Sequence, residues 1–308
     1  MENLEKQLKS IGKDVLISLV ILIFILGILF VYSGRWPPLV VIESSSMSHG
    51  TGDPPDSQIG VIDTGDIVIV KETSGEDIIT YVEGKAEGYK TYGQYGDVLI
   101  YKALGKDKTP IIHRPVLYLI YNDGAFDIPS LKNLDYGEEW TLENEVQQGD
   151  ERWNNLTGSF YIHDYGYANK DIKIDLEPLL KFKHSGYITM GDHNPKIDQN
   201  LSDPICAEPV KNDWVEGKAR GELPWFGILK LITIGKTSYI PQNSWYYLFG
   251  SLSIILISPF LIEYSVEIYK RKIERPDSKN GGSRDNHYLE NNEEKNESEK
   301  IKEKRFDS

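Results

Sequence analysis

Two long apolar runs dominate the hydrophobic pattern of the chain. The first extends over 18 residues from Val15 to Tyr32, and the second over 20 residues from Trp245 to Tyr264, with the acid Glu263 near its end. A helix needs about 20 apolar residues to cross a hydrocarbon layer roughly 30 Å thick. Aromatic side chains border the second run, as they do at membrane interfaces. The pattern therefore predicts two transmembrane helices, residues 15–32 and 245–264.

A cleaved secretory signal is the alternative for the first run, because Lys6, Lys9 and Lys13 precede it. The apolar stretch is longer than the hydrophobic region of most such signals, however, and no small-x-small cleavage pattern follows it. We therefore favour an uncleaved signal anchor.

Basic residues mark one end of each run. Three lysines precede the first run, and four basic residues follow the second between Lys270 and Arg275, whereas the other two ends carry only Arg35. Basic flanks stay in the cytoplasm. We expect a cell-membrane protein with a cytoplasmic N-terminus (1–14), an extracytoplasmic domain (33–244) and a charged cytoplasmic tail (265–308).

The pattern between the two runs predicts strands rather than helices. Short stretches rich in β-branched residues recur between turn signals, and no 3.6-residue period is sustained. We therefore expect a mainly β domain with an antiparallel, barrel-like sheet. Its strands are predicted within GDIVIVK (65–71), GDVLIYK (96–102), PIIHRPVLYLIY (110–121) and GYITM (186–190).

Residues 122–184 differ in amino-acid composition from the flanking sequence. This stretch is polar, acidic and rich in aromatic residues, and it ends with two weaker strand patterns, SFYIHDY and DIKIDLEP. We interpret it as an insertion or subdomain. The end of the tail, from Pro276, carries seven basic and nine acidic residues with almost nothing to fill a core. The tail is therefore predicted to be disordered.

Charge and cysteine content narrow the function. The chain has a net charge of −13, and residues 33–244 carry 20 Lys and Arg against 32 Asp and Glu. An acidic domain of this size argues against nucleic-acid binding. The single cysteine, Cys206, cannot form an internal disulfide, and we expect it to be a small buried hydrophobic residue.

Four polar features of the outer domain could act together: SSSM (44–47), HR (113–114), GDHN (191–194) and Asp198. A serine hydroxyl becomes a nucleophile when a base removes its proton, and a neutral imidazole suits that task. A carboxylate that fixes the imidazole tautomer completes the set, and chain order is immaterial because such triads are defined by geometry. Taken alone the combination is weak, because 6 histidines and dozens of acids supply it by chance.

The same residues resemble a type I signal peptidase of the archaeal and endoplasmic-reticulum class. Six pieces occur in the family's order between the two apolar runs, which is far more specific than a lone Ser-Met. They are VIESSSM (41–47), GDIVIV (65–70), GDVLIYK (96–102), PIIHRPV (110–116), YITMGDHNPKID (187–198) and VEGKARGELPWFG (215–227).

The resemblance implies a role for each matching residue. Ser46 is the nucleophile, His113 takes the place of the catalytic lysine of bacterial relatives, and Asp198 is the catalytic acid. Asp192 matches a further position of the catalytic site, where a supporting role is expected. Ser44 matches the position whose hydroxyl helps the nucleophile's backbone N–H to form the oxyanion hole.

The resemblance also implies the enzyme's surroundings. Its substrates would be signal peptides of exported preproteins, with small residues at the first and third positions before the cut. Its partners would be membrane lipid and the secretion translocon, with no nucleic acid and no cofactor. One departure stands out: the family commonly has proline where this chain has His49 in SMSHG.

Two other kinds of site fit the sequence less well. Lys71 or Lys102 could serve as the base of a Ser–Lys dyad, but a lysine that ends a strand is usually solvated and keeps a high pKa. A metal site built from His113, His163 and other histidines lacks any fixed ligand spacing. We therefore expect no metal.

Two rival functions remain open from the sequence. The His49 departure and the 122–184 insertion would suit a catalytically inactive, membrane-anchored peptide-binding protein on the same fold. A processing peptidase for one dedicated surface-protein precursor is the other alternative.

Overall fold

The computed structural model describes residues 2–106, 108–144, 151–199, 202 and 204–273. Helix α1 (Glu2–Ser33) and helix α4 (Gln242–Ile273) each contain a segment long and apolar enough to cross a membrane. Helix α4 continues past the expected boundary at Tyr264, so the first residues of the predicted tail are helical. The rest of that tail, 274–308, lies outside the described residues.

The largest sheet is antiparallel throughout and contains every strand that the hydrophobic pattern predicts between residues 65 and 121 and at 186–190. The mainly β class is therefore confirmed. Along the sheet the order is β1 (Leu39–Val41), β2 (Ile67–Lys71), β12 (Val215–Leu223), β5 (Leu99–Tyr101), β6 (Ile111–Asn122) and β11 (Gly186–Met190), and β7 (Ala125–Asp127) also pairs with β6.

No sheet closes into a barrel among the described residues, so the expected barrel-like closure is not observed. Strand β1 pairs with β2 through only three residues, Leu39 to Val41. At the other side, β11 pairs with β6 only from Arg114 onward. The first residues of β6 thus pair with β5 alone, and closure would need a further strand between them and β1.

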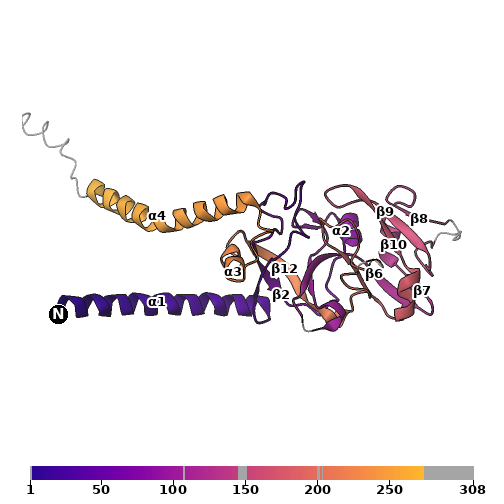
Figure 1. Cartoon of the computed structure of the whole chain (residues 1–308), viewed down its shortest axis with the longest axis horizontal. Helices are drawn as coiled ribbons and strands as arrows, with labels where there is room; N and C mark the ends of the chain where they lie inside the picture. Colours follow the sequence, from indigo (N-terminus) through magenta and orange to yellow (C-terminus); the bar gives the residue numbers. More distant parts are fainter. Residues whose placement is uncertain (1, 107, 145–150, 200–201, 203, 274–308) are drawn as a thin grey trace, which may run out of the picture. The chain divides into compact units, whose positions relative to one another are not determined.

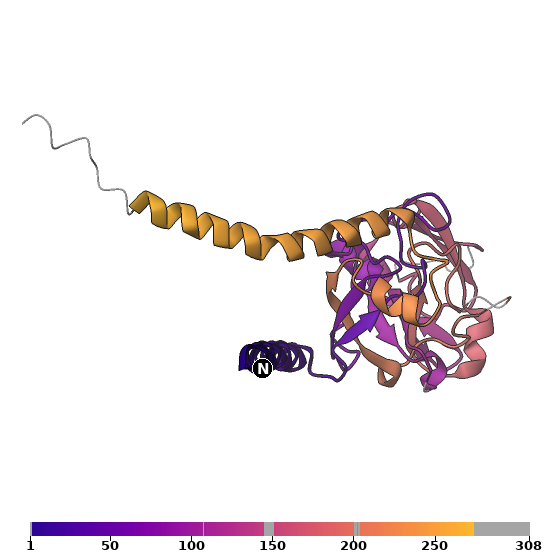
Figure 2. The ribbon, with the colours of Figure 1, turned by 60° about the vertical axis from the view of Figure 1, so that its left-hand side comes forward.

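The 122–184 segment forms a second, three-stranded sheet of β8 (Trp140–Leu142), β9 (Ser159–Tyr165) and β10 (Lys170–Asp175). Both weak strand patterns thus correspond to strands. Phe160 and Ile162 of β9 are fully buried in one core with Val116 and Leu117 of β6. Both ribbon views show these strands beside β6 and β7 (Figure 1, Figure 2). The segment therefore shares the core of the main sheet.

A short helix, α2 (Tyr81–Glu87), was not predicted. Thr80 caps its start by accepting a hydrogen bond from the Glu83 N–H, while the Glu83 carboxylate accepts from the Thr80 N–H. The remaining elements are small. They are the β3–β4 pair (Lys90–Thr91, Gln94–Tyr95), helix α3 (Ile228–Thr233) and 3-10 turns η1 (Ala103–Gly105), η2 (Pro129–Asn133), η3 (Glu177–Phe182) and η4 (Asn212–Trp214).

Two further apolar clusters lie on the main sheet. One contains Met47 with Val68, Val70 and Ile100, so the segment after β1 is anchored in the core. The other encloses Cys206, which is buried as expected.

Candidate active site

Ser46 lies in a tight turn that follows β1. The turn is closed by the Ser48 N–H, which donates to the Ser45 carbonyl oxygen at 3.1 Å. Met47 is only 2% exposed, whereas Ser46 is partly exposed. The methionine thus fastens the turn to the core and leaves the neighbouring hydroxyl at the surface.

His113 is brought to Ser46 by strand β6. Its Nε2 lies 3.0 Å from Ser46 Oγ. Successive strand residues point to opposite faces, so the neighbouring Arg114 is directed away from Ser46. Both side chains are buried, and His113 is 4% exposed. The two residues of the HR pair therefore lie in different surroundings, His113 beside Ser46 and Arg114 on the opposite face of β6.

Asp198 completes the chain of contacts. Its Oδ2 lies 2.6 Å from His113 Nδ1 and accepts hydrogen bonds from the hydroxyls of Tyr101 at 2.8 Å and Thr189 at 2.7 Å. Burial alone would raise the pKa of Asp198, but the His113 charge and these hydrogen bonds lower it below its usual value. An ionised carboxylate here accepts a hydrogen bond from the Nδ1–H group, which leaves the unprotonated Nε2 available to accept from the Ser46 hydroxyl.

A register shift in β11 helps to place Thr189. The pairing of β11 with β6 shifts between Ile188 and Thr189, and Thr189 lies opposite Pro115. Proline has no N–H for the ladder, and such interruptions commonly occur at bulges.

Asp192 contacts a different set of side chains. Its two oxygens accept from Arg114 Nε at 2.8 Å and Nη2 at 2.7 Å, and its Oδ2 also lies 2.9 Å from His49 Nε2. Burial would raise the pKa of Asp192, yet the Arg114 guanidinium brings it down to about 2. Asp192 therefore forms a buried ion pair beside the Ser46–His113 contact.

Arg114 extends this network. It is fully buried, and its Nη1 donates to the carbonyl oxygens of Tyr95 at 3.1 Å and Gly96 at 3.0 Å. His49, which replaces the expected proline, is 7% exposed and is the second partner of Asp192.

Gly191 allows the loop that carries Asp192 to approach Ser46 closely. A Cβ atom at this position would lie 2.5 Å from the Ser46 carbonyl oxygen and 2.9 Å from His113 Nε2. Real Cβ atoms do not come this close, so only glycine fits. The His193 N–H then donates to the Ser46 carbonyl oxygen at 2.9 Å.

Ser44, the oxyanion-hole candidate, lies at the surface. Its hydroxyl oxygen is 3.3 Å from Ser46 Oγ. The structure thus brings Ser44, Ser46, His113 and Asp198 together, and it sets Asp192 in the adjoining ion pair.

A groove of about 450 Å³ opens at Ser46 and His113. Its walls come from the end of β1 and the segment after it, 40–44, and from 109–112 at the start of β6. Asn194 of the Gly191 loop also lines it. The volume is typical of a ligand-binding cleft, and the walls include several aliphatic side chains.

The alternative bases and ligands have other partners. Lys102 pairs with Glu216 at 3.4 Å, and the Lys71 ammonium lies over the Tyr32 ring. His163 pairs with Asp171 at 3.1 Å. Among these candidate bases, the side chain that contacts the Ser46 hydroxyl is His113.

Several residues of this site were missed from the sequence. Tyr101 and Thr189 resemble ordinary strand residues. Tyr167, whose hydroxyl lies 2.8 Å from His193 Nδ1 in the loop beside Ser46, belongs to the segment interpreted as an insertion. Only His49 could have been noticed from the sequence, because it stands in SMSHG where the family that the chain resembles commonly has proline.

Searches of the sequence against protein-family models and against curated proteins find no match.

Proposed function

We propose that this protein is a membrane-bound serine endopeptidase, a signal peptidase I, that removes N-terminal signal peptides from exported preproteins. The observation that carries the proposal is the contact chain from Ser46 Oγ through His113 to Asp198, with distances of 3.0 Å and 2.6 Å, and Ser46 and His113 both line a groove. The resemblance to the archaeal and endoplasmic-reticulum class supplies the substrate.

The reaction follows from the protonation states of the three groups. Ser46 Oγ attacks the scissile carbonyl carbon while its proton passes to His113 Nε2, and Asp198 stabilises the resulting imidazolium. The tetrahedral intermediate collapses when His113 returns that proton to the departing amine. Water, activated by the same imidazole, then releases the acyl group from Ser46.

The oxyanion of the intermediate needs two donors. The Ser46 backbone N–H is one, and the Ser44 hydroxyl, 3.3 Å from Ser46 Oγ, is close enough to turn toward the developing charge. The Asp192–Arg114 pair supports the loop rather than the reacting atoms.

An extended peptide suits the groove between β1 and β6. Residues 40–43 and 109–112 form its two sides. Among the described residues, β1 pairs only with β2 and the first residues of β6 pair only with β5, so each has one unpaired edge where the sheet stays open. A substrate strand could add main-chain hydrogen bonds there, in the manner of β-strand addition. With such a strand bound, the sheet would approach the barrel-like form expected from the sequence.

The two apolar helices fit a membrane-embedded enzyme. The basic flanks favour cytoplasmic termini and an extracytoplasmic catalytic domain at 33–244 in the cell membrane. Membrane lipid and the translocon are then the partners of the enzyme. The net negative charge of the catalytic domain argues against nucleic-acid binding.

Cleavage of a preprotein by the purified full-length chain in detergent tests the proposal. We expect mature product from wild type and a loss of at least about 10³-fold for Ser46→Ala and His113→Ala. Ser45→Ala is the matched control, and it should retain activity because its side chain has no role in the chemistry.

The rival functions are outcomes of the same assay. Absence of product from wild type, with retained binding of the preprotein, would indicate an inactive peptide-binding protein. Cleavage of one surface-protein precursor but no other preprotein in a panel would indicate a dedicated processing peptidase.

A further inference from the structure

We propose that the turn between β9 and β10, together with the first residue of β10, positions the active-site loops, with Tyr167 of the turn and Lys170 of β10 as the positioning residues. The inference rests on the proposed function, and it assigns a role to the 122–184 segment, which lies outside the resemblance.

Tyr167 bridges the two loops that flank the nucleophile. Its ring stacks on His49, with ring centroids 4.5 Å apart and an interplanar angle of 25°. Its hydroxyl lies 2.8 Å from His193 Nδ1 and 3.3 Å from the Gly50 carbonyl oxygen. One side chain thus holds both the chain that follows Ser46 and the loop that follows Gly191.

Lys170 holds the Gly191 loop by its backbone. Its ammonium donates to the carbonyl oxygen of Asn194 and, at 3.4 Å, to that of Asp192. Burial lowers the pKa of Lys170, and the Asp192 charge offsets part of this effect. A lysine that keeps such contacts in a half-buried place is tied to the loop rather than solvated.

The loops held in this way touch the reacting groups. The His193 N–H donates to the Ser46 carbonyl oxygen, and Asn194 lines the groove with Ser46 and His113. A displacement of about 1 Å at a reacting atom can cost roughly 10²-fold in rate. Loss of the Tyr167 or Lys170 contacts should therefore lower the rate through the Ser46–His113 geometry.

The core does not depend on either side chain. Tyr167 and Lys170 are partly exposed, whereas Phe160, Ile162 and Tyr165 of the same sheet fill the shared core. Substitution at the turn can thus separate positioning from folding.

The test compares preprotein cleavage by Tyr167→Ala, Tyr167→Phe, Lys170→Met and Lys170→Arg in the full-length chain. We expect kcat to fall about tenfold or more for the alanine and methionine variants, with KM changed less than about threefold. Tyr167→Phe keeps the stacking on His49 and should fall between wild type and alanine. Lys170→Arg keeps a cation of similar reach and should restore most of kcat.

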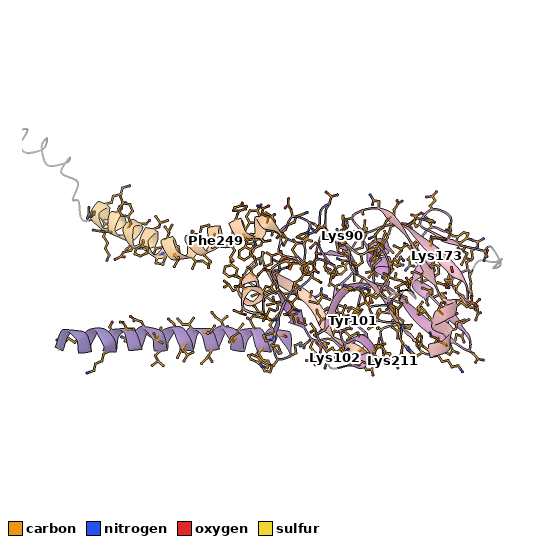
Figure 3. All side chains as sticks on the ribbon, in the orientation of Figure 1. Lys90, Tyr101, Lys102, Lys173, Lys211 and Phe249 are labelled. Carbon is orange, nitrogen blue, oxygen red and sulfur yellow. The ribbon has the colours of Figure 1, made fainter. Side chains whose placement is uncertain are left out.

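Matched controls come from the same sheet. Lys173 of β10, labelled in Figure 3, pairs with Glu143, and Tyr161 of β9 also contacts Glu143. Lys173→Met and Tyr161→Phe should leave kcat within about twofold of wild type.

The possible results separate the two proposals. If wild type releases no mature product, the proposed function fails. If wild type cleaves but Lys170→Met and Tyr167→Phe match it, the positioning role is wrong. The role is also wrong if Lys170→Arg is as impaired as Lys170→Met, or if the control variants lose as much kcat. Melting temperatures identify any variant that loses activity by unfolding, and Tyr167→Phe and Lys170→Arg then decide the question.

Discussion

Asp198 receives three polar hydrogens on a single oxygen. His113, Tyr101 and Thr189 all contact Oδ2, while Oδ1 is buried and has no hydrogen-bond partner among the described residues. Three donors on one atom fix the orientation of the carboxylate, and they favour its charged form. The orientation of the His113 ring, and so the reach of Nε2 to Ser46, follows from this arrangement.

Replacement of Asp198 by asparagine tests that arrangement. In Asp198→Asn an amide can no longer select the Nδ1-protonated tautomer of His113, so we expect kcat to fall by roughly 10³–10⁴-fold while the fold is retained. Cleavage rates and circular dichroism check both parts. Activity equal to wild type would overturn the role assigned to Asp198.

The buried ion pair predicts a different kind of defect. Asp192→Asn leaves the fully buried Arg114 without its charged partner, and removal of one member of such a pair commonly costs about 3–5 kcal/mol. We expect a large drop in the free energy of unfolding and a smaller loss of activity than for Asp198→Asn. Denaturant titration measures the first quantity. Asp171→Asn, which breaks a partly exposed pair with His163, should change stability little.

From the sequence, residues of the candidate site could be grouped only where residue type and order carried information. Ser46, His113 and Asp198 were grouped because they lie in ordered pieces that resemble one family. The structure brings the three side chains together, and their catalytic roles stay predictions. His49 and Tyr167 were not assigned roles. Their contact joins positions 118 residues apart, and no local pattern specifies such a pairing.

At the scale of elements, helix α2 was not predicted because it is short. Its seven residues make barely two turns, too few for a 3.6-residue period to stand out. The Thr80–Glu83 capping box was the readable signal, since a threonine followed by a glutamate three residues later marks a helix start.

The cap should contribute measurably to stability. In Thr80→Ala the Glu83 N–H loses its side-chain acceptor, and we expect a loss of about 1 kcal/mol in the free energy of unfolding. Thermal unfolding of the full-length chain in detergent provides the measurement. Thr157→Ala, at an exposed position, is the control, and an equal effect of both variants would contradict the role of the cap.

The strands were predictable and the closure of their sheet was not. Alternation and turn residues are local, so β2, β5, β6 and β11 could be located from short stretches. Closure depends on which edges meet, and β1 contributes only three paired residues to one edge. The sequence of a strand does not show whether another strand pairs with its second edge.

At the scale of the whole molecule, the free energy of unfolding should depend on pH through buried carboxyls, some with a raised pKa and some with a lowered pKa. Burial raises the pKa of Asp66 to about 7 and also raises the pKa of Glu222. Between about pH 4 and pH 7 the folded state then binds more protons than the unfolded state, so these groups lower stability as pH rises. Asp192, with its pKa near 2, contributes stability above about pH 4 that is lost as pH falls toward 2.

The free energy of unfolding should therefore pass through a maximum at mildly acidic pH. Asp66→Asn removes one titrating group, so we expect a flatter decline between pH 5 and pH 7 than in wild type. Denaturant midpoints across that range provide the measurement, with Asp56→Asn, an exposed carboxyl, as control. Identical slopes for wild type and Asp66→Asn would contradict the assignment.

The thiol of Cys206 should be inert in the folded chain. It is fully buried in the cluster with Tyr101 and Tyr187, and burial raises its pKa, so the reactive thiolate is scarce. We expect no modification by a maleimide in mild detergent and complete modification after denaturation, as read by mass spectrometry. Rapid labelling of the folded protein would contradict this burial.

Because the single native thiol is buried, the folded wild-type chain should give no background signal in cysteine-labelling experiments. A cysteine introduced at any exposed position would report alone, without prior replacement of the native one. Impermeant reagents applied to intact cells could then determine, position by position, which face of the membrane each segment occupies.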